Sequence, residues 1–143
     1  MSYLLDTNVI SELRKGERAD ASVTGWFADL ADEEIFLSVL TIGEIRRGVE
    51  SVRRRDPDSA AALDRWIGLV GEAYGDRILP VDRAVAEEWG RMNVPDPLPV
   101  VDGVLAATAR VRGLALATRN VADVAGTGVD LLDPFANSDR SGS

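Results

Sequence analysis

The sequence has 143 residues, of which 45% are hydrophobic and 28% charged, so it can form one globular domain with a buried core. It contains no cysteine and no histidine, which excludes disulfides, thiol chemistry, Ser-His triads and the usual zinc sites. The net charge of −8 disfavours non-specific binding of nucleic acid through a basic surface. Hydrolysis by this chain would therefore depend on carboxylates and a hard metal ion such as Mg²⁺.

The chain forms a single unit with a polar end. No internal repeat or linker interrupts it, so we expect one domain over residues 1–135 and a flexible polar tail over residues 136–143. No apolar stretch approaches the roughly 20 residues of a membrane span, and the first residues lack the basic start and apolar run of a signal peptide. We therefore expect a cytoplasmic protein.

The spacing of apolar residues predicts strands and helices that alternate along the chain. In chain order, the pattern predicts a strand at 3–5, helices at 9–13 and 23–30, a strand at 35–40, helices at 41–52 and 63–74, a strand at 78–81, a helix at 82–92, a proline-rich loop at 93–100, a helix at 102–112, and strands at 114–118 and 129–133. Asp56-Pro57-Asp58 is a turn signal, and Gly75 and Gly113 are typical helix stops. This alternation indicates an α/β fold, with a mostly parallel central sheet of about five strands and helices on both faces.

The stretch YLLDTNVISEL places Asp6 between the first predicted strand and the first predicted helix. Asp6 or Asn8 at this position can simply cap the helix that follows. Alternatively, Asp6 projects from the carboxyl end of a strand, where open α/β sheets bind ligands. The stretch alone leaves both interpretations open.

Further acidic residues follow other predicted strands or begin the helices next to them. Glu44 lies in the first turn after the second strand, Asp102 opens the helix before the fourth, and Asp123 comes shortly after the fourth. In a parallel sheet all these positions face one edge, so we expect the carboxylates to meet in one pocket with Asp6. Clustered carboxylates repel one another, and proteins seldom gather them without a cation.

Each of these acids also has a purely structural explanation. TIGE matches a capping box, with Thr41 as the cap and Glu44 reaching back to its backbone. Asp102 at a helix start is favourable for the helix dipole, and Asp123 can be an exposed loop acid. Asp82 also follows a strand, and we assign it only a capping role. The shared placement of the acids, rather than any one of them, favours a site.

The positive charge is concentrated in one short stretch. Arg46, Arg47, Arg53, Arg54 and Arg55 lie close together in the sequence, and they form either a solvated helical face or a docking patch for a partner. A second surface feature is apolar: the predicted helix at 63–74 carries Trp66, Ile67, Val70 and Tyr74 on one face. Beside the 42–52 helix, this face offers more apolar surface than a small domain easily covers, which predicts an interface.

Four blocks of the sequence together resemble PIN-domain ribonucleases, and most closely the VapC and FitB-like toxins of bacterial toxin–antitoxin pairs. The blocks are LLDTNVISEL, LSVLTIGEIRRGV, VVDGVLAATA and LALATRNVADVAGTGVDLLDPF. They occur in the family's order and spacing and cover nearly the whole chain, to about Phe135. Gly103 departs from the alanine common in the family after the second aspartate, a difference that we do not expect to affect the chemistry.

The resemblance implies a metal site built from three acids. Asp6 matches the first aspartate of the family motif, Glu44 the glutamate and Asp102 the second aspartate. These residues would be catalytic and would bind Mg²⁺, for which Mn²⁺ can substitute. Glu44 could orient or deprotonate the attacking water.

A fourth acidic position is less clear in the resemblance. Many PIN domains carry an acid directly after the threonine block, where this chain has Asn120, and Asp123 is the nearby carboxylate. We therefore treat Asp123 as the fourth catalytic acid, with Asn120 as the alternative occupant of this position. Asn8, Thr118 and Asn120 are expected to make polar contacts in the site.

In function, the resemblance implies a Mg²⁺-dependent endoribonuclease, a hydrolase of phosphodiester bonds that acts as a toxin. It would cleave single-stranded regions of structured RNA, leave a 5′-phosphate and a 3′-hydroxyl, and be neutralised by a cognate antitoxin protein. Relatives of this kind form homodimers, so we expect a dimer. We also expect a partner peptide in a groove near Arg46 and Arg47.

Two other classes of function are considered. The chain could be a catalytically inactive PIN-like binding module that acts through its protein partner, with the acids serving as caps. A phosphotransfer receiver domain also has an acidic pocket at strand ends, but it usually needs a lysine late in the chain. Here Lys15 is the only lysine, which disfavours the receiver.

Overall fold

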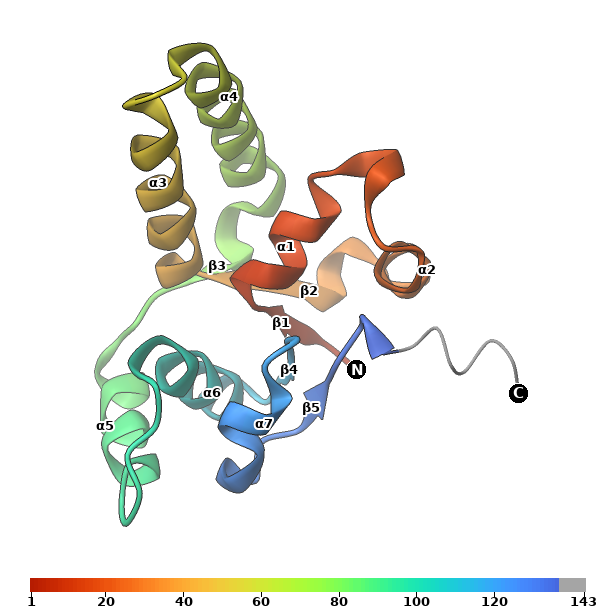
Figure 1. Ribbon diagram of the computed structural model, residues 1–143. Coiled ribbons are helices and arrows are strands. Elements are labelled where there is room, and N and C mark those ends of the chain that lie inside the picture. The colour runs from red at the N-terminus through yellow and green to blue at the C-terminus, as the bar shows by residue number, and fades with distance from the viewer. Residues whose placement is uncertain (137–143) are drawn as a thin grey trace.

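Five parallel strands form the central sheet of the computed structural model, which describes residues 1–136 (Figure 1). The strands lie in the order β3-β2-β1-β4-β5, and every neighbouring pair is parallel. Their bounds are β1 Tyr3–Leu5, β2 Ile35–Ser38, β3 Ile78–Leu79, β4 Ala115–Ala117 and β5 Leu131–Leu132. The predicted parallel sheet is confirmed, whereas the predicted tail lies, apart from Ala136, outside the described residues.

In the described part of the chain, seven α-helices cover the two faces of the sheet (Figure 1). On one face lie α1 Thr7–Leu13, α2 Ala21–Ala28, α3 Val39–Arg53 and α4 Pro57–Tyr74, and on the other lie α5 Arg83–Met92, α6 Val100–Arg112 and α7 Val121–Val124. Short 3₁₀ turns occupy Gly16–Arg18, Asp32–Glu34, Gly75–Arg77 and Ala125–Thr127. None of the helices within residues 1–136 is both long and apolar enough to cross a membrane.

Each face of the sheet packs against its own hydrophobic core, and strand β1 contributes to both cores. Leu5 belongs to the core under α1–α4 and Leu4 to the core next to α5–α7, and neither is exposed to solvent. Successive residues of a strand point to opposite faces, so two consecutive leucines are what a strand covered on both faces requires. Because β1 is the middle strand, Asp6 emerges at the centre of the sheet's carboxyl edge.

The second strand ends two residues earlier than predicted. β2 stops at Ser38, and Val39 and Leu40 already belong to α3. The Ser38 hydroxyl oxygen accepts a hydrogen bond from the Leu40 amide at 3.0 Å and so caps the helix. The expected strand at 35–40 is therefore wrong at its end, because an apolar pair such as Val39-Leu40 fits a strand and a buried helical turn equally well.

Other boundaries differ mainly at helix starts. α4 begins directly after Asp56, whose carboxylate accepts from the Ser59 amide at 3.2 Å, so the predicted turn is a capped helix start. α6 begins at Val100, two residues before the predicted start. The predicted cap Asp82 is confirmed by a 3.0 Å hydrogen bond from the Val85 amide. The helix α7 was not predicted, because four residues are too few to show a period.

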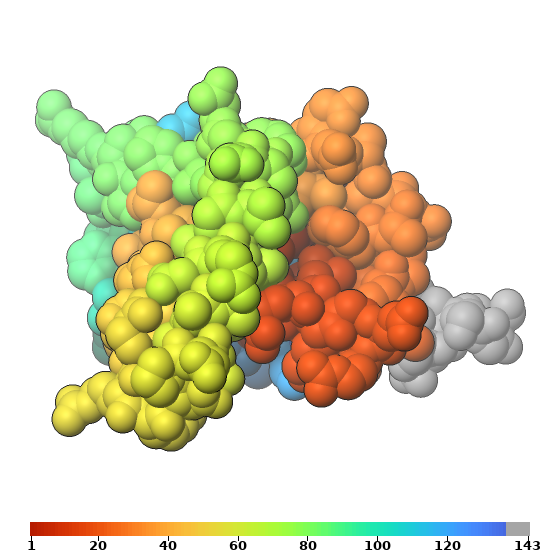
Figure 2. Space-filling model, turned by 90° about the horizontal axis from the view of Figure 1, so that it is seen from above, coloured from red at the N-terminus to blue at the C-terminus, as the bar shows by residue number. Residues whose placement is uncertain are grey.

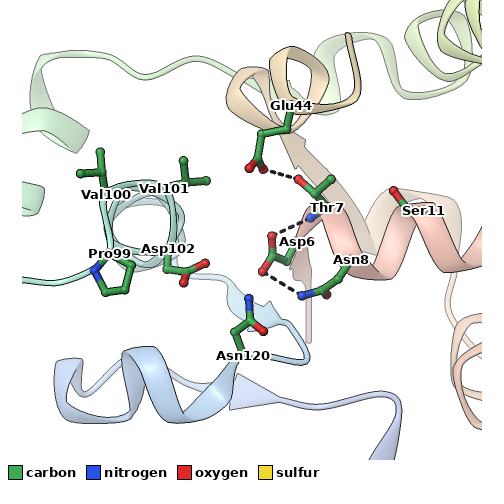
Figure 3. A pocket seen from close by; sticks show the side chains of 10 residues that line it. All are labelled: Asp6, Thr7, Asn8, Ser11, Glu44, Pro99, Val100, Val101, Asp102 and Asn120. Carbon is green, nitrogen blue, oxygen red and sulfur yellow. Dashed lines mark hydrogen bonds between the residues drawn. The ribbon is translucent and has the colours of Figure 1, made fainter. Parts of the chain in front are cut away.

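The segments that follow β1, β2 and β4 lie along one edge of the sheet. The Asp6 amide donates to the Ala117 carbonyl at 2.9 Å, which ties the carboxyl ends of β1 and β4 together. α3 leaves β2 at the same edge, and the amino-terminal end of α6 points its first turn toward it (Figure 3). Segments far apart in the sequence therefore converge on Asp6.

Candidate active site

An open cavity of about 580 Å³ lies at this carboxyl edge (Figure 3). Its lining comes from α1, α3, α6 and the segment after β4: Asp6, Thr7, Asn8, Ser11, Glu44, Pro99, Val100, Val101, Asp102 and Asn120. The structure thus brings Asp6, Glu44 and Asp102 to one pocket, as the sequence predicted. We call it the acidic pocket.

Asp6 is held rigidly although it lines the pocket. Its side chain is 5% exposed, and one carboxylate oxygen accepts a 2.7 Å hydrogen bond from the Thr118 hydroxyl. The other oxygen accepts from the Thr7 amide at 2.6 Å, so Asp6 also caps α1. Burial raises the pKa of Asp6, the negative charge of Glu44 adds to this, and the bonds from Thr118 and Thr7 oppose it. Asp6 therefore both caps α1 and lines the acidic pocket at the carboxyl end of β1, and ligand binding by Asp6 stays a prediction.

Glu44 does not belong to a capping box. Ser38 caps α3, so Thr41 lies inside the helix, fully buried, and Glu44 lies in the second turn after the cap. The expected Thr41–Glu44 box is wrong for this reason. Instead, one Glu44 carboxylate oxygen accepts a hydrogen bond from the Thr7 hydroxyl at 2.5 Å. Thr7 therefore connects both acids: its amide binds Asp6 and its hydroxyl binds Glu44.

Asp102 approaches the pocket from the opposite side. It lies in the first turn of α6, and its carboxylate points across the pocket toward Asp6 (Figure 3). Burial raises its pKa first, followed by the negative charges of Asp6 and Asp123, with a smaller effect from Glu44. The repulsion expected of clustered acids is therefore present in this pocket.

In the segment after β4, Thr118 binds Asp6 and Asn120 lines the acidic pocket. Thr118 is buried, donates to Asp6, and accepts a 2.9 Å hydrogen bond from the Asn120 amide through the same hydroxyl oxygen. Asn120 lines the acidic pocket, facing Asp102 (Figure 3). Asp123 is exposed in α7 and does not line the pocket, although its charge raises the pKa of Asp102. The lining position is thus occupied by Asn120, and a catalytic role for Asp123 stays a prediction.

The donor set of the pocket consists of oxygen atoms from carboxylates, hydroxyls and amides. Within residues 1–136, no group of three or more acids, histidines or cysteines is arranged to hold one ion. Thr7 engages one oxygen of Glu44, Thr7 and Thr118 engage the two oxygens of Asp6, and Asp6 and Asp102 face each other. Glu44 as a third ligand stays a prediction. Mg²⁺ binds through one or two carboxylates and otherwise keeps waters or accepts phosphate oxygens. The Asp6 and Asp102 pair fits that requirement.

The predicted docking arginines behave differently from each other. Arg46 makes ion pairs with Glu50 and, across the two helices, with Asp64 of α4. Arg53 binds the same two acids, so both arginines fasten α3 to α4. The neighbouring acids hold the pKa of the Arg46 guanidinium above its usual value. Arg46 is thus engaged within the chain, whereas Arg47 is exposed and makes no ion pair within residues 1–136. The docking role of both arginines stays a prediction.

A second groove, mostly apolar, continues from the acidic pocket along α1 and α4. Two cavities of about 240 and 250 Å³ compose it, and Figure 2 shows the hollow between α4 and the α1–α2 segment. The groove is lined by Thr7, Ser11, Glu44, Ile45, Gly48, Val49, Val52 and Leu63, and further along by Ile10, Leu13, Arg14, Phe27, Trp66, Leu69, Val70, Ala73 and Tyr74. Leu69 is 63% exposed. Trp66, Val70 and Tyr74 of the predicted apolar face of α4 thus line the groove. Ile67 does not line it, although it packs against the same core as the other three.

Sequence reasoning missed several lining residues. Thr7 and Ser11 are one helical turn apart on the pocket side of α1, and this spacing could have suggested them once Asp6 was singled out. The hydrogen bond from Thr7 to Glu44 joins residues 37 positions apart and depends on how α1 packs beside α3. No pattern in either segment contains that information.

Comparison with known proteins finds the same relationship over nearly the whole chain. The model of the PIN domain matches residues 3–122. VapC ribonuclease Y4jK of Sinorhizobium fredii (strain NBRC 101917 / NGR234) is 33% identical over 140 residues, which cover 92% of this chain and 96% of the relative. Toxin FitB of Neisseria gonorrhoeae (strain ATCC 700825 / FA 1090) is 29% identical over 137 residues, covering 92% and 97%. The crystal structure of FitAcB from Neisseria gonorrhoeae matches with a TM-score of 0.86 at 28% identity, covering 94% of this chain and 99% of that one.

Proposed function

The chain belongs to the PIN domain family, and we propose that it is a metal-dependent endoribonuclease toxin of the VapC and FitB type, acting in the cytoplasm. The observation that carries the proposal is the acidic pocket, in which Asp6, Glu44 and Asp102 from three separate segments converge. Similarity to a VapC ribonuclease supports RNA as the substrate. By the family resemblance, the cleaved sites are single-stranded regions of structured RNA.

In this proposal Asp6 and Asp102 would supply carboxylate oxygens to Mg²⁺ or Mn²⁺, and Glu44, the third predicted ligand, could add another. The bound ion would neutralise charge on the phosphate and lower the pKa of a bound water. Glu44 orients the attacking water or accepts its proton, a task that no histidine in this chain can perform. The Asn8 and Asn120 amides lie at the pocket wall, where they can donate to phosphate oxygens. Cleavage would leave a 5′-phosphate and a 3′-hydroxyl.

Induced expression of the chain in a bacterial host tests the proposal. We expect growth to stop and cellular RNA to be cut at discrete positions whose ends are a 5′-phosphate and a 3′-hydroxyl. Normal growth with intact RNA, from a protein that is expressed and folded, would favour the inactive binding module instead. Mapping the ends by ligation before and after phosphate removal identifies which chemistry occurred.

Thr7 should be needed to hold Glu44 in place. Replacing Thr7 with Val keeps the shape of the side chain but removes the hydroxyl that binds the Glu44 carboxylate. We expect kcat to fall by about 10–100-fold, the usual effect of losing a group that orients a site residue. Thr7→Ser retains the hydroxyl and should restore most of the rate. Equal rates for wild type and Thr7→Val would show that this hydrogen bond is not used.

We also propose an antitoxin partner and a homodimer, consistent with the similarity to the toxin FitB. The apolar groove between α1 and α4 is the surface that a partner segment would occupy, beside Arg47 and the internally paired Arg46.

Because Leu69 and its neighbours leave apolar surface uncovered, association of two chains is expected at micromolar concentration. Light scattering should give twice the mass of one chain, and a purely monomeric protein would contradict the dimer.

A further inference from the structure

Arg119 lies in the sequence between Thr118, which binds Asp6 of the acidic pocket, and Asn120, which lines the pocket. The Arg119 amide itself donates to the side-chain oxygen of Asn8, another lining residue, at 3.3 Å. Consecutive Cα atoms are about 3.8 Å apart, so the Cα of Arg119 lies next to that of Asn120, a lining residue of the pocket.

The Arg119 guanidinium is positioned without using its hydrogen-bond donors. It lies over the ring of Phe135, with 3.7 Å between the guanidinium carbon and the ring centroid, and the residue is exposed. Within residues 1–136 its N–H groups make no hydrogen bond or ion pair. The nearby acid Glu12 has both carboxylate oxygens occupied, by Lys15 and by the Asp20 amide. Among the residues that the structure describes, Arg119 is therefore a cation held over Phe135 whose donors have no partner.

The acidic pocket needs such a cation if its substrate is a polyanion. No lysine or arginine of residues 1–136 lines the pocket, and the whole chain carries a net charge of −8. A nucleic-acid strand would be repelled here unless arginine or lysine beside the pocket neutralised some of its phosphates. The planar guanidinium fork matches two phosphate oxygens at once, and a stacking ring limits the side-chain freedom that binding must remove. Arg119 on Phe135 has both properties.

We propose that Arg119 binds a backbone phosphate of the RNA strand next to the one that is cleaved, with Phe135 holding the guanidinium in position. This role rests on the ribonuclease function proposed above. It is separate from the chemistry, because Arg119 contacts a phosphate that does not react. Its loss should therefore weaken substrate binding much more than it slows the cleavage step.

The salt dependence of RNA binding tests this role. A single-stranded RNA that the wild type cleaves is titrated in EDTA, by fluorescence anisotropy, between about 50 and 200 mM salt. Arg119→Gln should bind about tenfold more weakly at low salt, and its slope of log affinity against log salt should be smaller by about 0.7, the value for one phosphate of a single strand. Arg119→Lys keeps the charge, so it should keep the slope and lose only part of the affinity. In cleavage assays with Mg²⁺, Arg119→Gln should raise KM and leave kcat nearly unchanged.

Arg54→Gln is the matched control, because it removes the same charge from an exposed arginine at the far end of α3. Arg54 lies about 24 Å from Ser38 along the helix axis. Its slope should equal that of the wild type, and all variants should have similar melting temperatures. An unchanged slope for Arg119→Gln, an equal decrease in Arg54→Gln, or loss of the slope in Arg119→Lys would overturn the role of Arg119. In each case RNA cleavage by the wild type would leave the proposed function standing, whereas a wild type that neither binds nor cleaves RNA would refute both.

Discussion

The Asp6→Asn variant should lose RNA cleavage almost completely while it keeps its fold. Asn has nearly the same shape as Asp, and its carbonyl oxygen can still accept from the Thr7 amide and cap α1. The negative charge that would bind Mg²⁺ is gone, however. Removing a residue that orients a metal-binding side chain lowers activity by about 10–100-fold. Removing the metal-binding carboxylate itself should therefore lower the cleavage rate by more than about a hundredfold. The measurement is the single-turnover cleavage rate at saturating RNA.

Asp82→Asn provides the control for Asp6→Asn. Asp82 also follows a strand and also caps a helix, through a 3.0 Å hydrogen bond from the Val85 amide, but it does not line the acidic pocket. Because Asn caps a helix about as well as Asp, Asp82→Asn should cleave RNA at the wild-type rate. If Asp6→Asn also kept the wild-type rate, Asp6 would be only a cap and the pocket would not be the active site.

Asp102→Asn should separate metal binding from stability. Mn²⁺ that binds only the folded state increases the free energy of unfolding, by roughly 2.7 kcal/mol when its concentration is a hundred times Kd. The melting temperature rises as a result. With Asp102 replaced, we expect this increase to shrink strongly and RNA cleavage to be lost. In EDTA, the variant should melt at the same temperature as the wild type or a few degrees higher, because one of the repelling charges is absent. Equal stabilisation of both proteins by Mn²⁺ would show that Asp102 is not a ligand.

The pH dependence of these melts has a definite sign. Burial raises the pKa of Asp6 and of Asp102, so the folded state holds their protons more tightly than the unfolded state does. The stabilisation from this effect is complete below the unfolded pKa and is lost as the pH rises through the raised folded pKa. In EDTA, the melting temperature of Asp102→Asn minus that of the wild type should therefore increase as the pH rises over this range, because the groups common to both proteins cancel in the difference.

The sequence predicted the acids of the site because each marks a boundary between two patterns. Asp6 ends a short apolar run that precedes a helical pattern, and Asp102 lies in the first turn of a helix with clear periodicity. Parallel strands place such boundaries at one edge, so convergence followed from the alternation of elements. The position of Asn120 in the lining, rather than Asp123, required the structure, because a few residues of loop give no period.

The sequence-based predictions failed where the structure of a segment depended on contacts with distant segments. Ser38 and Thr41 are both plausible caps in the same stretch, and the apolar residues between them suit a strand or a helix. The hydrogen bond from Thr7 to Glu44 requires α1 and α3 to pack side by side. Likewise, Arg46 finds Asp64 only because α3 and α4 form an adjacent pair. Local patterns specify which elements form, and packing decides which side chains meet.

Removal and return of the metal tests the central claim most directly. The purified wild-type protein is incubated with an end-labelled single-stranded RNA in excess EDTA, and Mg²⁺ or Mn²⁺ is then added in excess over the chelator. If the acidic pocket is a metal-dependent nuclease site, the RNA stays intact in EDTA and is cut when either ion is restored. Cleavage at the same rate in EDTA as in Mg²⁺ would contradict the account.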